Sequence, residues 1–138
     1  MRFITLVKSK EDSVGAIPPD FLEDMDKLAK DATADGCVMI GTGGLYPTAA
    51  GARVALTGGK VTVTDGPFSE AKEVIGGYAM FETNSKASII KWTERFMELH
   101  KRHLPGWEGV TEIRQLYEEG EKPCDQVREA HKAHEAVI

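Results

Sequence analysis

The sequence contains no apolar run approaching the roughly 20 residues of a membrane span, and its first residues lack the long apolar core of a signal peptide. It also has no basic excess: 17 Lys and Arg stand against 22 Asp and Glu, giving a net charge of -5. Nucleic acids and anionic membranes both attract basic surfaces, so neither is expected as a partner. These absences predict a soluble, cytoplasmic protein.

Cysteine is scarce, and the motifs of common metal and cofactor sites are missing. Cys37 and Cys124 are expected to be free thiols in a reducing cytoplasm, with a structural disulfide as the alternative. The glycines at 41–44 are not followed by the Lys-Ser/Thr of a phosphate-binding loop. His131 and His134 are three residues apart, but a metal site normally requires a third protein ligand. We therefore expect no metal and no cofactor.

The residues that are present predict two helices and six strands in the core. Pro18-Pro19 opens a helix that ends at Gly36, and Ser85 is a suitable N-cap for a second helix. Gly58-Gly59 suits the two-residue loop of a hairpin. Apolar and β-branched residues predict strands at 2–7, 37–40, 53–57, 60–64, 74–83 and 110–117, with a glycine-rich turn at 41–44.

This order, β-α-β-(hairpin)-β-α-β, is that of a ferredoxin-like α+β domain. The domain is expected to occupy residues 1–118. Residues 119–138 are charged and poor in apolar side chains, and Pro123–Val137 is expected to form a helical tail outside the core.

Each predicted helix has a single apolar stripe, which suits a sheet covered on only one side. The stripes are formed by residues 21, 22, 25, 28, 29 and 32, and by residues 89, 90, 93, 96 and 97. Leu6, Met80, Phe81 and Ile113 are too apolar to leave both faces of the sheet in water. A second copy of the chain is the expected cover, so the sequence predicts a homodimer in which two sheets form a dimeric α+β barrel.

Two segments resemble a known family. Residues 60–78, which include Asp65-Gly66-Pro67-Phe68, are similar to the signature of the DGPF-domain branch of the YCII-related family. Pro105-Gly106-Trp107-Glu108-Gly109 is similar to a segment of one subgroup, and the resemblance covers about residues 1–118.

The resemblance implies a dimeric α+β barrel whose relatives include isomerases, monooxygenases and dehalogenating enzymes. Some DGPF proteins are associated with extracytoplasmic-function sigma factors, which implies a regulatory role as the alternative. Smaller family members are expected to use a His–Asp pair in their cleft. Here the first helix has no histidine, and the four histidines (His100, His103, His131 and His134) come late in the chain.

Asp65 is the first candidate for chemistry. A carboxylate after a strand, followed by the constrained pair Gly66-Pro67, suits a positioned acid or base. The alternative is structural, because aspartate in turns commonly accepts hydrogen bonds from the backbone. Lys72 is placed to reach an anion beside Asp65, or else belongs to a solvated charged segment.

Glu112 and Arg114 are two residues apart in a predicted strand, so their side chains share one face. Arg114 is suited to clamp an anionic ligand, and the alternative is a solvated ion pair. Tyr78 is suited to offer a hydroxyl to a pocket, or to pack as plain core. His100 lies in the last turn of the second helix, where a cation complements the helix dipole.

Two functions are compatible with these residues. The first is a small-molecule-binding protein or cofactor-independent enzyme that uses Asp65, Tyr78, Glu112 and Arg114 on a polar or anionic ligand in the cleft of the dimer. The second is a non-enzymatic regulatory module that uses the tail from Gly120 onward to contact a partner. Whether the protein is an enzyme stays open at this stage.

Overall fold

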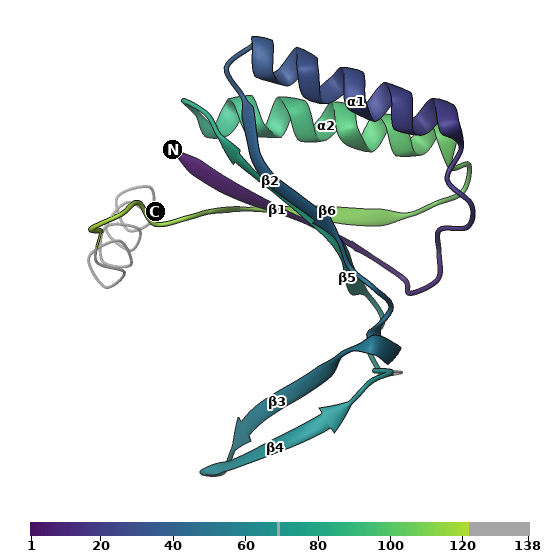
Figure 1. Cartoon of the computed structure of the whole chain (residues 1–138), viewed down its shortest axis with the longest axis vertical. Coiled ribbons are helices and arrows are strands. Elements are labelled where there is room, and N and C mark those ends of the chain that lie inside the picture. The colour runs from purple at the N-terminus through teal and green to yellow at the C-terminus, as the bar shows by residue number, and fades with distance from the viewer. Residues whose placement is uncertain (69, 122–138) are drawn as a thin grey trace, which may run out of the picture.

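Two helices lie on one side of a four-stranded antiparallel sheet, and a long hairpin projects from the other side (Figure 1). The computed structural model describes residues 1–68 and 70–121. In chain order, the elements are β1 (Arg2–Ser9), α1 (Pro19–Ala34), β2 (Val38–Gly44), the short 3-10 helix η1 (Thr48–Ala50), β3 (Ala52–Thr57), β4 (Lys60–Asp65), β5 (Val74–Glu82), α2 (Lys86–His103) and β6 (Gly109–Gln115).

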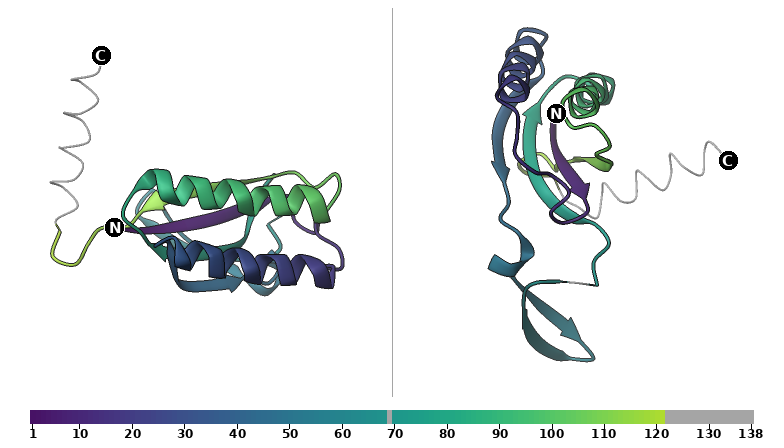
Figure 2. Two further views of the ribbon diagram at one scale, coloured as in Figure 1. Left: turned by 90° about the horizontal axis from the view of Figure 1, so that it is seen from above. Right: turned by 90° about the vertical axis from the view of Figure 1, so that its right-hand side faces the viewer.

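The sheet has the order β2-β5-β1-β6, and each neighbouring pair is antiparallel. This α+β arrangement confirms the predicted element order and is compatible with a ferredoxin-like fold. The two helices run side by side over the same face of the sheet (Figure 2). We call the side of the sheet away from the helices the open face. The predicted tail helix, 123–137, lies outside the described residues.

The helices begin and end at the residues expected from the sequence. Pro19 is the first residue of α1, and Gly36 follows its end with a φ of 86°. The Ser85 hydroxyl caps α2 by accepting a hydrogen bond of 3.1 Å from the backbone N–H of Ser88. The apolar stripes are only partly correct, because Leu22 is 55% exposed and Ile90 is 36% exposed. Within the described part of the chain, no helix is long and apolar enough to cross a membrane.

The glycine-rich segment expected to form a turn belongs instead to the edge strand β2, which continues to Gly44. Gly41 and Gly43 pair with Met80 and Tyr78 of β5. A Cβ atom at Gly41 would come within 3.1 Å of the Met80 side chain, and one at Gly43 would come within 2.9 Å of the Tyr78 ring. These glycines make room on the open face for two large side chains of β5, a reason that becomes visible only when the strands are paired.

The main buried cluster occupies one end of the space between the helices and the sheet. Phe3, Ala32, Ile89 and Trp92 pack there around the free thiol of Cys37, which has no solvent exposure. Burial raises the pKa of the Cys37 thiol, so this cysteine stays protonated and acts as a small apolar side chain. The opposite end of the same space is hollow.

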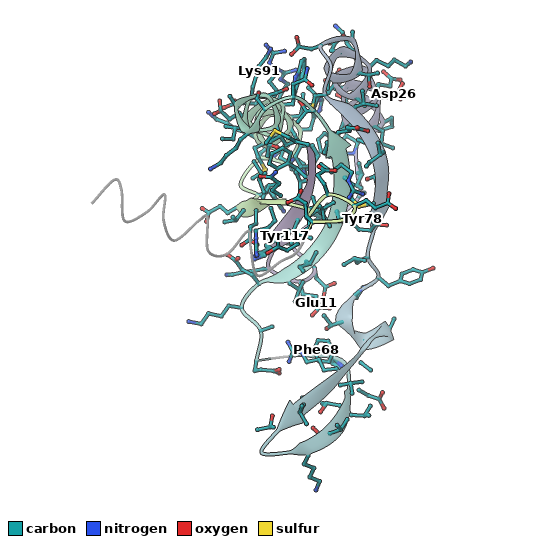
Figure 3. All side chains as sticks on the ribbon, turned by 90° about the vertical axis from the view of Figure 1, so that its left-hand side faces the viewer. Glu11, Asp26, Phe68, Tyr78, Lys91 and Tyr117 are labelled. Carbon is teal, nitrogen blue, oxygen red and sulfur yellow. The ribbon has the colours of Figure 1, made fainter. Side chains whose placement is uncertain are left out.

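The hairpin, which we call the arm (residues 52–65), is joined to the body through η1 and the segment after β4. The Glu11 carboxylate accepts hydrogen bonds from the backbone N–H of Thr48 (2.5 Å) and from its hydroxyl (2.8 Å). The same hydroxyl accepts a hydrogen bond of 3.2 Å from the N–H of Phe68. Figure 3 shows Glu11 and Phe68 at this junction between sheet and arm. The root of the arm is therefore attached by defined polar contacts.

Candidate functional site

A cavity of about 450 Å³ lies between the helices and the sheet, beside the buried cluster. Both helices, the sheet, and the loops before α1 and after α2 contribute to its wall. Among the residues that the structure describes, none that lines this cavity is charged. Large apolar side chains form much of the wall: Ile17, Phe21, Met25, Phe96, Leu104 and Trp107.

The cavity exists because the helix-facing side of the sheet changes from large to small residues along its length. At one end Phe3 of β1 pairs with Phe81 of β5, and both rings pack in or against the buried cluster. Farther along, Thr5 pairs with Ala79 and Val7 pairs with Gly77. Small side chains there leave a gap between the sheet and the helices above it, and the gap forms the floor of the cavity.

Two titratable residues line the cavity, His100 of α2 and Tyr78 of β5, and His100 is the buried one. Its side chain lies among the rings of Phe21, Phe96 and Trp107, with centroid separations of 4.5–5.0 Å, and the residue is only 7% exposed. Burial lowers the pKa of His100, so the imidazole is neutral at pH 7. Nδ1 lies 2.9 Å from the carbonyl oxygen of Phe96. A carbonyl only accepts hydrogen bonds, so Nδ1 carries the proton and Nε2 is the acceptor.

Trp107 covers one side of His100, with the ring centroids 4.6 Å apart. Its position depends on the turn before β6 and on a glycine after it. The N–H of Trp107 donates to the carbonyl of Leu104 (3.0 Å), and Gly106 has a φ of 83°. A Cβ atom at Gly109 would clash with the indole ring, so glycine at this position lets the ring lie against the start of β6. The segment 105–109 thus builds one wall of the cavity.

The indole Nε1 of Trp107 is buried without a hydrogen-bond partner among the described residues. An unsatisfied buried donor costs about 1–3 kcal/mol, and native structures contain few of them. A hydrogen-bond acceptor that reached this nitrogen would remove the cost. The cavity therefore combines a largely apolar wall with Nε2 of His100 as an acceptor and Nε1 of Trp107 as a donor without a described partner. Hydroxyl residues also line it: Thr5, Ser9, Thr42, Tyr78, Thr93 and Thr111.

A second histidine forms a His–Asp pair outside the cavity wall. Nε2 of His103 lies 2.7 Å from the carboxylate of Asp24, and Nδ1 lies 3.5 Å from that of Asp20. Arg102 lies 3.7 Å from the same Asp24 carboxylate. These contacts join the end of α2 to the start of α1. The carboxylates come from the first helix and the imidazole from the second. This pair was not predicted from the sequence, because only histidines within the first helix were considered.

Three of the five predicted site residues share the open face. Tyr78 and Glu112 pair with opposite sides of Leu6, and Arg114 pairs with Ile4. The Glu112 carboxylate lies 3.1 Å from Lys8 Nζ and 3.5 Å from Arg114 Nη1. The Lys8 ammonium, followed by the Arg114 guanidinium, lowers the pKa of Glu112. Glu112 is therefore an ionised member of a surface ion-pair group.

The other two predicted residues lie away from this group. Asp65 is the exposed last residue of β4, at the root of the arm, and Lys72 is exposed in the segment before β5. Neither lines the cavity. The five candidates thus do not converge on one site, and their roles in ligand binding stay predictions.

Two residues of the cavity wall, His100 and Trp107, could have been recognised from the sequence but were interpreted differently. His100 follows Phe96 at i+4 and so continues the apolar stripe of α2 into the cavity. Its interpretation as a cation complementing the helix dipole does not hold, because burial lowers its pKa. Trp107 belongs to the segment that resembles the family. The one local indication of its ring position is Gly109, where a Cβ atom would clash with the ring.

The described residues contain no group of three His, Cys, Asp or Glu side chains placed to hold a metal ion. His131 and His134 lie outside this part of the chain. No curated protein matches the chain. The model of one family, the YCII-related domain, matches residues 1–118. That match spans every strand and helix described above, and the chain belongs to the YCII-related domain family.

Proposed function

We propose that this protein binds an uncharged, largely apolar small molecule in the helix–sheet cavity, and that Nε2 of His100 accepts a hydrogen bond or a proton from it. The observation that supports this proposal is the buried, neutral His100 in a cavity wall without charged residues. Its Nδ1 proton is held by the Phe96 carbonyl, which leaves Nε2 as the basic atom. This is the arrangement required for cofactor-independent acid–base work.

The proposed ligand differs from the polar or anionic one that the sequence suggested. Arg114 and Lys72, the cations expected to bind an anion, lie outside the cavity. An anion in the cavity would lose its hydration without gaining a cationic partner. A flat ring system with a hydroxyl or carbonyl group suits the aromatic wall and the polar atoms of His100 and Trp107.

We also propose that the protein is a homodimer formed through the open faces, as in a dimeric α+β barrel, and that it belongs to the DGPF branch. Ile4, Leu6, Tyr78 and Met80 supply apolar or amphipathic surface on the open face. Tyr78, on the inner strand β5, would then face the second sheet, whereas Glu112 and Arg114, on the edge strand β6, would lie toward the rim of the contact. Glu112 and Arg114 would then act in the dimer and not in the cavity, which Tyr78 also lines.

The occupancy of the cavity can be tested by filling it. Ala79 faces the helices and lines the cavity, whereas its neighbour Met80 faces the other way. Ala79→Leu should weaken binding of the neutral probe N-phenyl-1-naphthylamine by tenfold or more, measured by its fluorescence. Met80→Leu is the matched control and should change binding less than twofold. Equal binding by Ala79→Leu and wild type would place the probe elsewhere.

The role of His100 can be tested with two ligands that differ by one hydroxyl. Replacing His100 by Leu should weaken 1-naphthol about tenfold, the value of one hydrogen bond of about 1.4 kcal/mol, and leave naphthalene nearly unchanged. Calorimetry measures both affinities. Equal losses for the two ligands would show that His100 only shapes the wall. No binding of any probe to wild type would favour the alternative, a regulatory module without a small ligand.

A further inference from the structure

The arm presents an apolar surface that its own chain leaves uncovered. All twelve residues of β3 and β4 are exposed. In the hairpin register, Val54 pairs with Val63 and Leu56 pairs with Val61. Directly paired residues lie on the same face, so these four aliphatic side chains form one face of the arm. They are 64–73% exposed.

The opposite face of the arm is polar. Arg53 pairs with Thr64, Ala55 with Thr62, and Thr57 with Lys60. In β4 polar and apolar residues alternate strictly, and in β3 only Ala55 departs from the alternation. Such alternation is the pattern of a strand pair with one buried face. A two-stranded hairpin in water is at best marginally stable when nothing covers it. The sequence of the arm is therefore suited to an assembly in which its apolar face is covered.

The arm is also held in a defined direction. Beyond the Glu11–Thr48–Phe68 contacts, the N–H of Gly66 donates to the carbonyl of Gly51 across the root (2.9 Å). Arg53 forms an ion pair with Glu70 and lies over the Phe68 ring, 3.9 Å from its centroid. A surface held in place before binding loses less entropy when it meets a partner.

We infer that the apolar face of the arm packs against a second copy of this chain, so that two arms clasp the proposed homodimer. The helices occupy one side of the sheet, and the arm projects from the other side, the side of the open face (Figures 1 and 2). A second copy seated on the open face would lie on the same side as the arm. In a two-fold dimer, the arm contact occurs twice.

The area of this contact agrees with that assignment. Four aliphatic side chains that are about two-thirds exposed present on the order of 300 Å². Two such arms, each covering an equal area on the other chain, bury on the order of 1,200 Å² in total, the lower end of the range for a specific interface. Contact between the open faces adds to this, so the arms and sheets together supply enough area for a stable dimer.

The test exchanges two residue types between the two faces of β4. Val61→Thr with Val63→Thr keeps the β-branched shape but makes the apolar face polar, whereas Thr62→Val with Thr64→Val alters the opposite face. Analytical ultracentrifugation of the full chain should give a dimer dissociation constant raised tenfold or more for the first variant. The second variant should remain as dimeric as wild type. An unchanged constant in the first variant would overturn the inference.

A crosslinking experiment covers the case in which the first variant fails to fold. A photo-crosslinking phenylalanine analogue at position 61 should yield a covalent dimer from purified protein, and the same analogue at position 62 should yield much less. Equal yields at 61 and 62 would count against the arm contact.

The inference rests on the proposed homodimer, but the two fail separately. A dimer that Leu6→Asn dissociates and the arm variant does not would retain the sheet contact and remove the clasp. A monomeric wild-type chain at 100 μM would remove both, while leaving the cavity proposal intact.

Discussion

The two described histidines lie only three residues apart on α2, but they have different surroundings. Nδ1 of His103 lies 3.5 Å from the Asp20 carboxylate, and Nε2 lies 2.7 Å from that of Asp24. His100 lies among aromatic rings, where burial lowers its pKa. The two surroundings differ because of position on the helix: the His103 ring faces the start of α1, and the His100 ring lines the cavity. His103 is therefore suited to join helices, and His100 to meet a ligand.

The lowered pKa of His100 predicts a dependence of stability on pH. Its folded-state pKa lies below the ordinary value of 6.5, so the unfolded chain binds the proton more readily. The free energy of unfolding should include the full contribution of neutral His100 above pH 6.5. This contribution should be lost as the pH falls from 6.5 through the folded-state pKa.

Urea unfolding of wild type and His100→Leu between pH 7.5 and 5 measures this effect. The unfolding free energy of wild type should fall relative to that of the variant as the pH falls, because the variant has no proton to gain at this position. A difference that stays constant with pH would contradict a lowered pKa. Other titrating groups are common to both proteins and cancel in the comparison.

At the scale of elements, the arm depends on a close approach between its root and η1. The backbone of Gly66 lies against the carbonyl of Thr48, so a Cβ atom at Gly66 would clash with it. Gly15, by contrast, has open space around the position of a Cβ atom. This contact gives a physical reason for the glycine of the Asp65-Gly66-Pro67-Phe68 motif: it lets β4 return to the body beside η1.

Gly66→Ala should therefore loosen the arm while leaving the sheet and helices folded. We expect the protection of β3 and β4 amides from hydrogen exchange to fall by about 1–3 kcal/mol, the usual cost of overpacking. Gly15→Ala is the matched control and should leave it unchanged. Equal protection in the two variants would mean that the root accommodates a methyl group.

At the scale of the whole molecule, the chain has helices over one side of its sheet and a largely uncovered open face on the other. Ile4 and Leu6 of β1 and Met80 of β5 remain half-buried there without a covering layer. Lys8, Glu112 and Arg114 add an ion-pair group at one edge of this apolar surface. Such a surface suits contact with a second copy, in which the apolar centre is buried and the ion pairs lie toward the rim.

Leu6→Asn should weaken that contact without removing a residue from the cavity. We expect the variant to sediment as a monomer at concentrations where wild type is a dimer, because a polar amide would be buried at the centre of the interface. The thermal midpoint of wild type should rise with protein concentration, and that of the variant should not. A dimer of unchanged strength would place the interface elsewhere.

The sequence by itself determined the elements and their order. Pro18-Pro19, Ser85 and Gly58-Gly59 act through local geometry, and the helix and hairpin boundaries that they predicted were confirmed. The signature around Asp65 also indicated the family correctly. These signals depend on neighbours in the chain, so a linear reading suffices for them.

Only the tertiary structure decided where the cavity lies and which residues reach it. In the sequence, nothing distinguishes Gly77 and Ala79 from other strand residues. In the structure, they line the cavity together with Phe96 and His100 of α2. Gly41 and Gly43 resembled a turn until pairing with β5 showed the side chains that they accommodate. Burial, and with it the pKa of His100, is a property of the packed molecule, because it depends on residues distant in the sequence.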